Sequence, residues 1–70
     1  MYIFNPKHDK TLYAESNETS LEEAIKDVEF DFHIHDWEMR RTDDPSVVNL
    51  YLKGCYQDTF TIIESDGENV

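Results

Sequence analysis

The spacing of hydrophobic positions changes several times along this chain, and each spacing predicts a different element. Residues 1–5 form a short, mainly apolar run. In residues 11–15 the aliphatic Leu12 and Ala14 alternate with Thr11, Tyr13 and Glu15. The segment between them begins at Asn5-Pro6 and is rich in turn-forming residues. Alternation with a period of two is typical of strands, so we expect a β-hairpin over residues 1–15.

A helix is predicted after this hairpin, from Leu21 to about Glu29. Ser20 is placed to accept a hydrogen bond from the first turn, and Glu23 completes a capping box three residues later. A helix this short needs a sheet to pack against. Its apolar side chains follow the i, i+3, i+4, i+7 spacing of a single buried stripe. These residues are Leu21, Ala24, Ile25 and Val28.

From residue 30 the apolar period becomes two, which predicts a strand. Phe30, Phe32 and Ile34 share one face of that strand. After residue 34 the apolar positions change parity. We therefore expect a β-bulge near His35–Asp36 that returns Trp37 to the core side.

Two further strands are predicted toward the C-terminus, over Val47–Lys53 and Thr59–Glu64. Phe60 and Ile62 are expected to face inward from the second of them, because they alternate with polar residues. Gly54 begins the loop between the two strands, and we expect the following residues, including the single cysteine, to lie in that loop.

The predicted order is therefore β-β-α-β-β-β. Consecutive strands joined by short turns pair antiparallel, so we expect an α+β fold. It has a small antiparallel sheet with the one helix packed on one face. A chain of 70 residues allows one domain, which we assign to residues 1–64. We expect residues 65–70 to form a frayed acidic tail.

Composition narrows the classes of function that remain. A lone cysteine excludes a disulfide scaffold and favours a reducing compartment, so we expect a cytoplasmic protein. The N-terminus lacks the pattern of a signal peptide, and no apolar run is long enough to cross a membrane. Phosphate loops, nucleophile elbows and dinucleotide fingerprints do not occur in the sequence. We therefore expect no enzymatic activity and no cofactor.

Charge is the strongest feature of the sequence. There are 16 Asp and Glu residues against 6 Lys and Arg residues, for a net charge of -10. Proteins that bind nucleic acids or anionic membranes use cations to neutralise phosphates, so both classes of direct ligand are excluded. A net charge of about 2–8 keeps a small domain soluble. The net charge of -10 exceeds this range, and the additional negative charge indicates binding to a basic partner.

The acids are concentrated in residues 15–38, where Lys26 is the only Lys or Arg. In an extended chain, the i, i+2 spacing of two such acids places their carboxylates about 6.6 Å apart, close to the phosphate spacing of a DNA strand. We predict that this segment binds the partner and that Trp37, with Tyr13 or Tyr56, anchors it, because interface energy concentrates in aromatic residues. The alternative is that Trp37 belongs to the core. The predicted acidic contacts are Glu22, Glu23, Asp27, Glu29, Asp31, Asp36 and Glu38.

In overall type the chain resembles the small acidic inhibitors of phages and mobile elements. These include anti-CRISPR proteins, anti-restriction proteins and inhibitors of uracil-DNA glycosylase, many of which mimic DNA. The resemblance rests on length, charge, the lack of catalytic motifs and the α+β pattern, and it assigns no role to any residue. It implies a non-enzymatic inhibitor, phage-encoded and active in a bacterial cytoplasm. Such an inhibitor occupies a basic nucleic-acid-binding site on a partner protein.

Three other interpretations compete with this one. The acidic surface of a small structural domain can serve solubility alone. The chain can instead form a homodimer, with Met1–Asn5 or Thr59–Glu64 pairing as an exposed edge strand. The third alternative is a metal site on His33 and His35, which point the same way if they lie on a strand. Further metal ligands would come from His8, Cys55 or Asp36.

Overall fold

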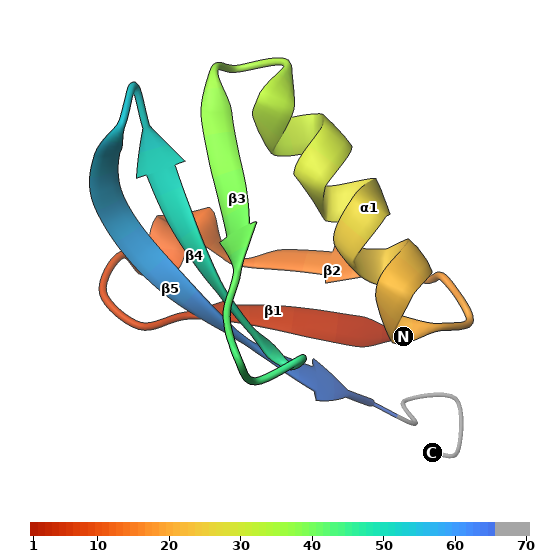
Figure 1. Cartoon of the computed structure of the whole chain (residues 1–70). Coiled ribbons are helices and arrows are strands. Elements are labelled where there is room, and N and C mark those ends of the chain that lie inside the picture. Colours follow the sequence, from red (N-terminus) through yellow and green to blue (C-terminus); the bar gives the residue numbers. More distant parts are fainter. Residues whose placement is uncertain (66–70) are drawn as a thin grey trace.

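Five strands form one antiparallel sheet, and a single α-helix packs on one of its faces (Figure 1). This architecture comes from a computed structural model, which describes residues 1–65. It confirms the predicted α+β fold and the order β-β-α-β-β-β. The elements are β1 (Tyr2–Pro6), a single 3-10 turn η1 (Lys10–Leu12), β2 (Ala14–Ser16), α1 (Leu21–His33), β3 (Trp37–Arg41), β4 (Val47–Leu52) and β5 (Cys55–Glu64).

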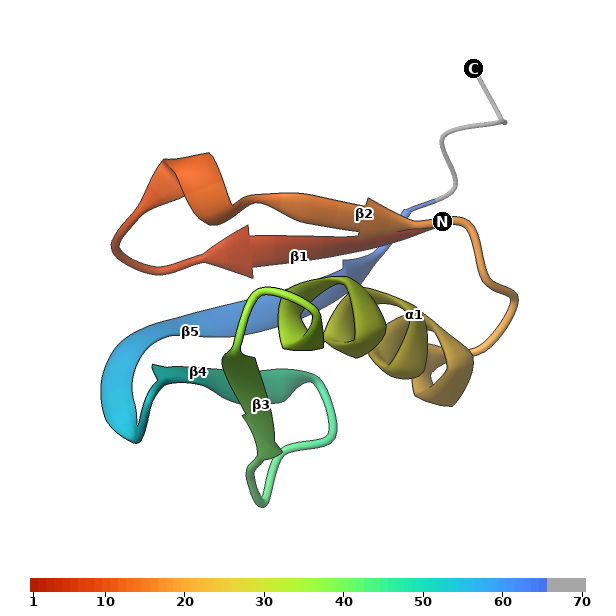
Figure 2. The same ribbon diagram turned by 90° about the horizontal axis from the view of Figure 1, so that it is seen from above.

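The strand order is β2-β1-β5-β4-β3, so the first and last strands of the chain lie inside the sheet. α1 links the two edge strands, β2 and β3, and crosses one face of the sheet between them (Figure 1 and Figure 2). Edge pairing through Met1–Asn5 or Thr59–Glu64 is therefore wrong, because β1 and β5 each have a neighbour on both sides. A homodimer through another surface stays a prediction.

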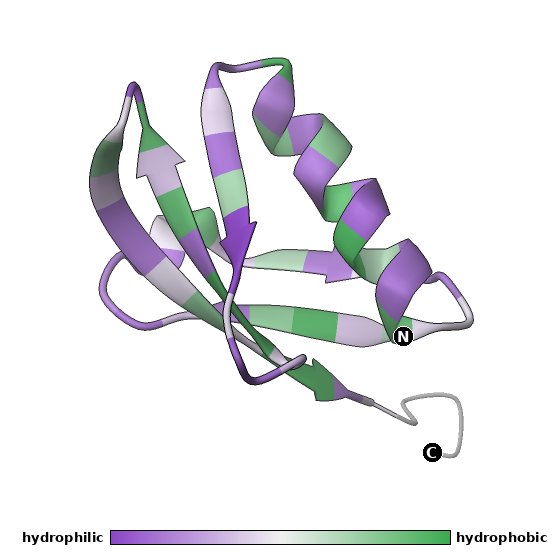
Figure 3. Ribbon diagram, viewed as in Figure 1, coloured by the Kyte–Doolittle hydropathy of each residue, from purple (hydrophilic) through white to green (hydrophobic). Residues whose placement is uncertain are grey.

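The core lies between α1 and the sheet. Figure 3 shows hydrophobic positions alternating with hydrophilic ones along the strands and around the helix. The rings of Phe4 and Phe32 both meet Phe60 edge to face, with centroids 5.7 Å apart in each pair. The predicted helix stripe is confirmed, with Leu21 partly buried at its start. The buried apolar residues are Phe4, Ala24, Ile25, Val28, Met39, Val48, Leu50, Phe60 and Ile62.

The strand predicted from residue 30 is wrong, because α1 continues to His33. Phe32 follows Val28 at i+4 and extends the buried stripe by one turn, whereas Phe30 is 66% exposed and Ile34 60% exposed. An alternation of three apolar residues fits a helix when only the middle one packs against the core. At the start of α1, the Ser20 Oγ caps the helix as predicted, accepting from the Glu23 N–H at 3.2 Å. The other half of the predicted capping box is wrong, because the Glu23 carboxylate accepts from the Thr19 and Ser20 hydroxyl groups and not from the Ser20 N–H.

A turn, and not the predicted bulge, connects α1 to β3. The N–H groups of His35 and Asp36 donate to Phe32 and His33, and Asp36 then takes a left-handed φ of 69°. Asp is one of the few residues that tolerate this conformation. Trp37 nevertheless lies on the core side, as predicted.

Two strand boundaries also differ from the prediction. β2 begins at Ala14 because the preceding residues form the 3-10 turn, which Asp9 caps by accepting from the Thr11 N–H. β5 begins at Cys55, which is therefore in a strand and not in a loop. Its first residues pair with β4 through a register shift, since Leu50 lies opposite Asp58 and the next residue of β4 lies opposite Tyr56.

A buried carboxylate holds the connection between β1 and β2. Asp58, which has no exposed surface, accepts hydrogen bonds from the backbone N–H groups of Lys7, His8 and Asp9 at 2.7–3.3 Å. The Thr59 N–H donates to it as well, at 2.7 Å. Burial raises the pKa of Asp58, but these four donors outweigh burial and leave the pKa below its usual value.

The predicted tail begins at Ser65, whose N–H donates to the Met1 carbonyl at 2.8 Å. The rest of that prediction, residues 66–70, lies outside the described residues. The structured domain therefore includes at least the whole of the predicted range 1–64.

Candidate protein-binding site

The predicted acidic contacts lie on α1 and on the segment that follows it. The first five of them, from Glu22 to Asp31, are helical. Glu29 and Asp31 are therefore not in extended chain: side chains at i and i+2 point about 200° apart around a helix. The left-handed turn at Asp36 also breaks an extended path to Glu38. The carboxylate spacing that matched DNA phosphates is therefore absent both from Glu29 and Asp31 and from Asp36 and Glu38.

Two of these acids form ion pairs with arginines of β3. Arg41 binds Glu22 through two hydrogen bonds, of 2.5 and 2.9 Å, and Arg40 binds Glu38 at 3.1 Å. Each arginine lowers the pKa of the carboxyl group that it holds. Exposed pairs of this kind add little to stability, but they remove negative charge from the surface.

Two further acids are engaged within the fold. Asp27 accepts from the Ser16 hydroxyl at 2.8 Å, which ties α1 to β2. The Glu23 carboxylate accepts from the hydroxyl groups of Thr19 and Ser20 at 3.4 Å. Within residues 1–65, the predicted acids whose carboxylates have no hydrogen-bond partner are Glu29, Asp31 and Asp36.

Exposed apolar side chains accompany these acids at the C-terminal end of α1. Phe30 and Ile34, at i and i+4, lie one turn apart on the solvent side of the helix. Large apolar side chains in such a position are costly to leave in water, and apolar groups rimmed by charge are typical of protein-binding surfaces. We call this surface the helix-end surface. It consists of Glu29, Phe30, Asp31, Ile34 and Asp36.

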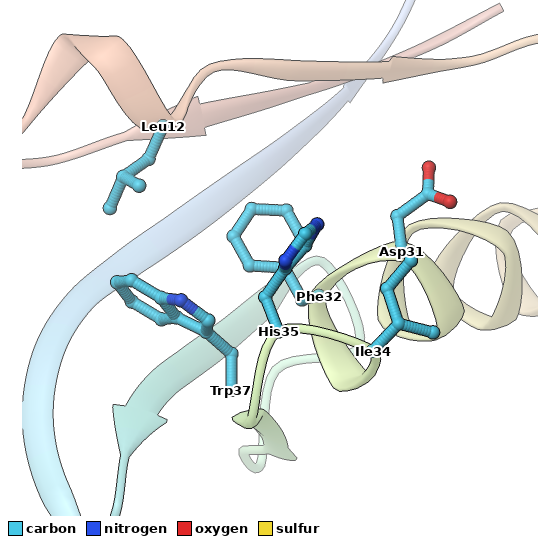
Figure 4. A pocket seen from close by; sticks show the side chains of 6 residues that line it. All are labelled: Leu12, Asp31, Phe32, Ile34, His35 and Trp37. Carbon is cyan, nitrogen blue, oxygen red and sulfur yellow. The ribbon is translucent and has the colours of Figure 1, made fainter.

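A pocket of about 290 Å³ opens beside the helix-end surface (Figure 4). Its walls include the rings of Phe32 and Trp37, which meet edge to face at 5.7 Å between centroids. Both rings are partly buried against the core, so Trp37 belongs to the core and to the candidate site at once. Figure 4 shows Leu12 above Trp37 and the His35 ring beside Phe32. The lining residues are Leu12, Asp31, Phe32, Ile34, His35 and Trp37.

The other predicted anchors lie outside this pocket. Tyr13 and Tyr56 are each 47% exposed, and their hydroxyl groups bond to Glu15 and Thr59. Sequence reasoning missed Leu12, Phe32, Ile34 and His35 as pocket residues. The signal for Phe32 was its i+4 spacing from Val28, whereas Leu12 and His35 become neighbours of Trp37 only through the fold.

The histidines predicted to share a strand face do not do so. His33 is the last residue of α1, and His35 follows it in the turn. Of the other proposed ligands, His8 packs edge to face on Tyr56, and Cys55 is exposed at the start of β5. Within residues 1–65, no three His, Cys, Asp or Glu side chains gather as a metal site.

Over the same described range, no helix has the length and apolar character needed to cross a membrane. Comparison with family models, curated proteins and solved structures gives no match to this chain. The surface that combines unpaired acids, exposed apolar side chains and a pocket is the C-terminal end of α1.

Proposed function

We propose that this chain is a non-enzymatic inhibitor that binds a basic, nucleic-acid-binding site on another protein through its helix-end surface. The observation that carries the proposal is that Phe30 and Ile34 are exposed at the C-terminal end of α1, with Glu29 on one flank of the helix, Asp31 on the other and Asp36 in the turn that follows. The acids attract and orient a basic partner, and the apolar side chains supply contact area once the two surfaces meet.

The rest of the surface supports this choice of face. On the side of the sheet away from α1, β4 and β5 present uncharged residues between their buried ones. At the β3 edge of that face, Glu38 and Arg40 neutralise each other, and the Arg40 guanidinium also lies 4.0 Å from the centre of the Tyr51 ring. At the β2 edge, Glu15 lies opposite Ile3. The net charge of -10 is thus unevenly placed, and a basic partner is drawn toward the helix side.

The geometry does not favour a simple mimic of the phosphate backbone, because the carboxylates lack a regular spacing. The helix-end surface instead offers mixed chemistry, with three acidic residues and two exposed apolar side chains at one end of α1. Basic grooves that bind nucleic acid contact phosphates and bases together, and aromatic side chains commonly stack on the bases. A surface that combines charge with an exposed phenyl ring is suited to compete for such a groove.

The test is a competition assay with a panel of purified basic nucleic-acid-binding proteins, each bound to fluorescent DNA. This chain is added, and displacement of the DNA is measured. Changing Glu29 and Phe30 together to lysine should weaken displacement at least 30-fold, because it removes charge and apolar contact at the centre of the surface. The matched control changes Asp43 and Ile63 to lysine, which alters the net charge equally and also removes an exposed apolar side chain.

The control should weaken displacement no more than about threefold, since Asp43 lies in the β3–β4 connection and Ile63 on the open face of the sheet. Circular dichroism of both double variants checks that they remain folded. Equal losses in the two variants would show that only net charge matters. Full displacement by the Glu29→Lys, Phe30→Lys protein would contradict the proposal, as would a wild-type chain that displaces DNA from no member of the panel.

A further inference from the structure

We propose that the pocket between Phe32 and Trp37 receives one cationic side chain of the protein partner, with arginine favoured over lysine. This inference rests on the proposed function and specifies how the helix-end surface recognises a basic partner. Three features select the ligand: two perpendicular aromatic rings, an acidic residue in the lining, and the C-terminal end of a helix.

The aromatic rings provide the first contact. Phe32 and Trp37 stand at 90° to each other, so a group in the pocket can meet the face of one ring and the edge of the other. Cations bind to the faces of aromatic rings, and Trp is the strongest of the three aromatic residues in this respect. A guanidinium group is planar and weakly hydrated, so it stacks on such rings at a smaller desolvation cost than an ammonium group.

The electrostatics of the site favour the same charge. Asp31 is the one acidic residue of the lining, and Figure 4 shows it on the other side of Phe32 from Trp37. The pocket lies at the C-terminal end of α1, where the helix dipole favours cations. Among the described residues, the lining contains no lysine or arginine, and the two arginines of β3 are held elsewhere by Glu38 and Glu22.

The remaining lining suits the rest of an arginine side chain. Leu12 and Ile34 are aliphatic and offer apolar contact to the methylene stem, which long cationic side chains commonly bury. A volume of about 290 Å³ is at the lower end of the range for small-molecule sites, which matches one side chain better than a cofactor.

Trp37 makes this inference directly measurable, because it is the only tryptophan of the chain. N-acetylarginine amide is titrated at constant ionic strength and at pH 8, and Trp37 fluorescence is followed. We expect a saturable change with a dissociation constant in the millimolar range. The neutral isostere N-acetylcitrulline amide should bind at least fivefold more weakly, and the lysine amide more weakly than the arginine amide.

Asp31→Asn should weaken arginine binding at least threefold, whereas Asp43→Asn, which changes the net charge equally at a distant turn, should leave it unchanged. Equal binding of citrulline, no saturable change, or equal effects of the two variants would each overturn the inference. The proposed function can still stand in those cases, because DNA displacement by the wild-type chain and its loss in the Glu29→Lys, Phe30→Lys variant are measured separately. Conversely, if the pocket binds arginine but the chain displaces no DNA, the inference about the pocket holds and the proposed function is contradicted.

Discussion

Replacing Asp58 with alanine is expected to lower the free energy of unfolding by about 3 kcal/mol. The change removes a fully buried carboxylate that accepts from four backbone N–H groups, three of them in the β1–β2 connection. Hydrogen bonds to a charged group contribute about 1.5–3 kcal/mol each, and their sum is reduced because the loop relaxes and water enters. The melting temperature should fall by about 12–24 °C.

Asp43→Ala is the control, because Asp43 is an exposed acid in the β3–β4 connection. Its effect should stay within about 0.5 kcal/mol, as for most surface substitutions. Thermal unfolding followed by circular dichroism measures both variants. If Asp58→Ala melts within a few degrees of Asp43→Ala, the buried carboxylate does not hold the loop.

The dependence on pH gives the same prediction an independent check. A carboxyl group whose pKa is lowered by folding, as that of Asp58 is, stabilises the fold above its unfolded pKa of about 3.9. This contribution is lost as the pH falls through the folded pKa. The stability difference between wild type and Asp58→Ala should therefore be constant from pH 7 to 5 and shrink below about pH 4. A difference that grows on acidification would contradict the assignment.

Phe60→Ala is expected to cost about 4 kcal/mol, the second large effect. Phe60 is completely buried and is the central ring of the core, packed edge to face on Phe4 and Phe32. Truncation of a buried phenylalanine to alanine costs about 3–5 kcal/mol, because apolar contacts are lost and a cavity remains. In a domain of this size, much of the total stability is removed.

Urea unfolding, with Trp37 fluorescence as the signal, measures the effect of this substitution. Phe30→Ala is the matched control, since the same atoms are removed from a side chain that is 66% exposed. It should change the free energy of unfolding by less than about 0.5 kcal/mol. Similar losses in the two variants would show that the ring of Phe60 is not the centre of the core.

The fold class was predictable because the hydrophobic periods are local and strong. The helix stripe, the inward positions of β5 and the Ser20 cap all follow from the spacing of a few residues. The segment around Phe32 was not predictable in this way, since its short alternation fits a strand as well as the last turn of a helix. Its packing against Phe60, from a distant part of the chain, decides between them.

The candidate site was predictable only in part. Sequence alone places most acids in residues 15–38, but the pairing of Glu22 with Arg41 depends on β3 lying beside α1. Likewise, nothing local distinguishes Asp58 from the other acids, because its N–H donors come mainly from a loop about fifty residues earlier. The pocket depends on Leu12 meeting Trp37, which the sheet topology brings about.

The most direct test of the central claim is a map of backbone amide shifts when an arginine-rich peptide is added to the labelled chain at physiological salt. We predict that the largest shifts fall on residues 27–37, at the C-terminal half of α1 and the turn after it, and that the Trp37 indole N–H moves with them. Shifts that are largest on the open face of the sheet, around Asn49 and Thr61, would contradict the claim. So would shifts spread evenly over all acidic residues, including Asp43 and Glu64.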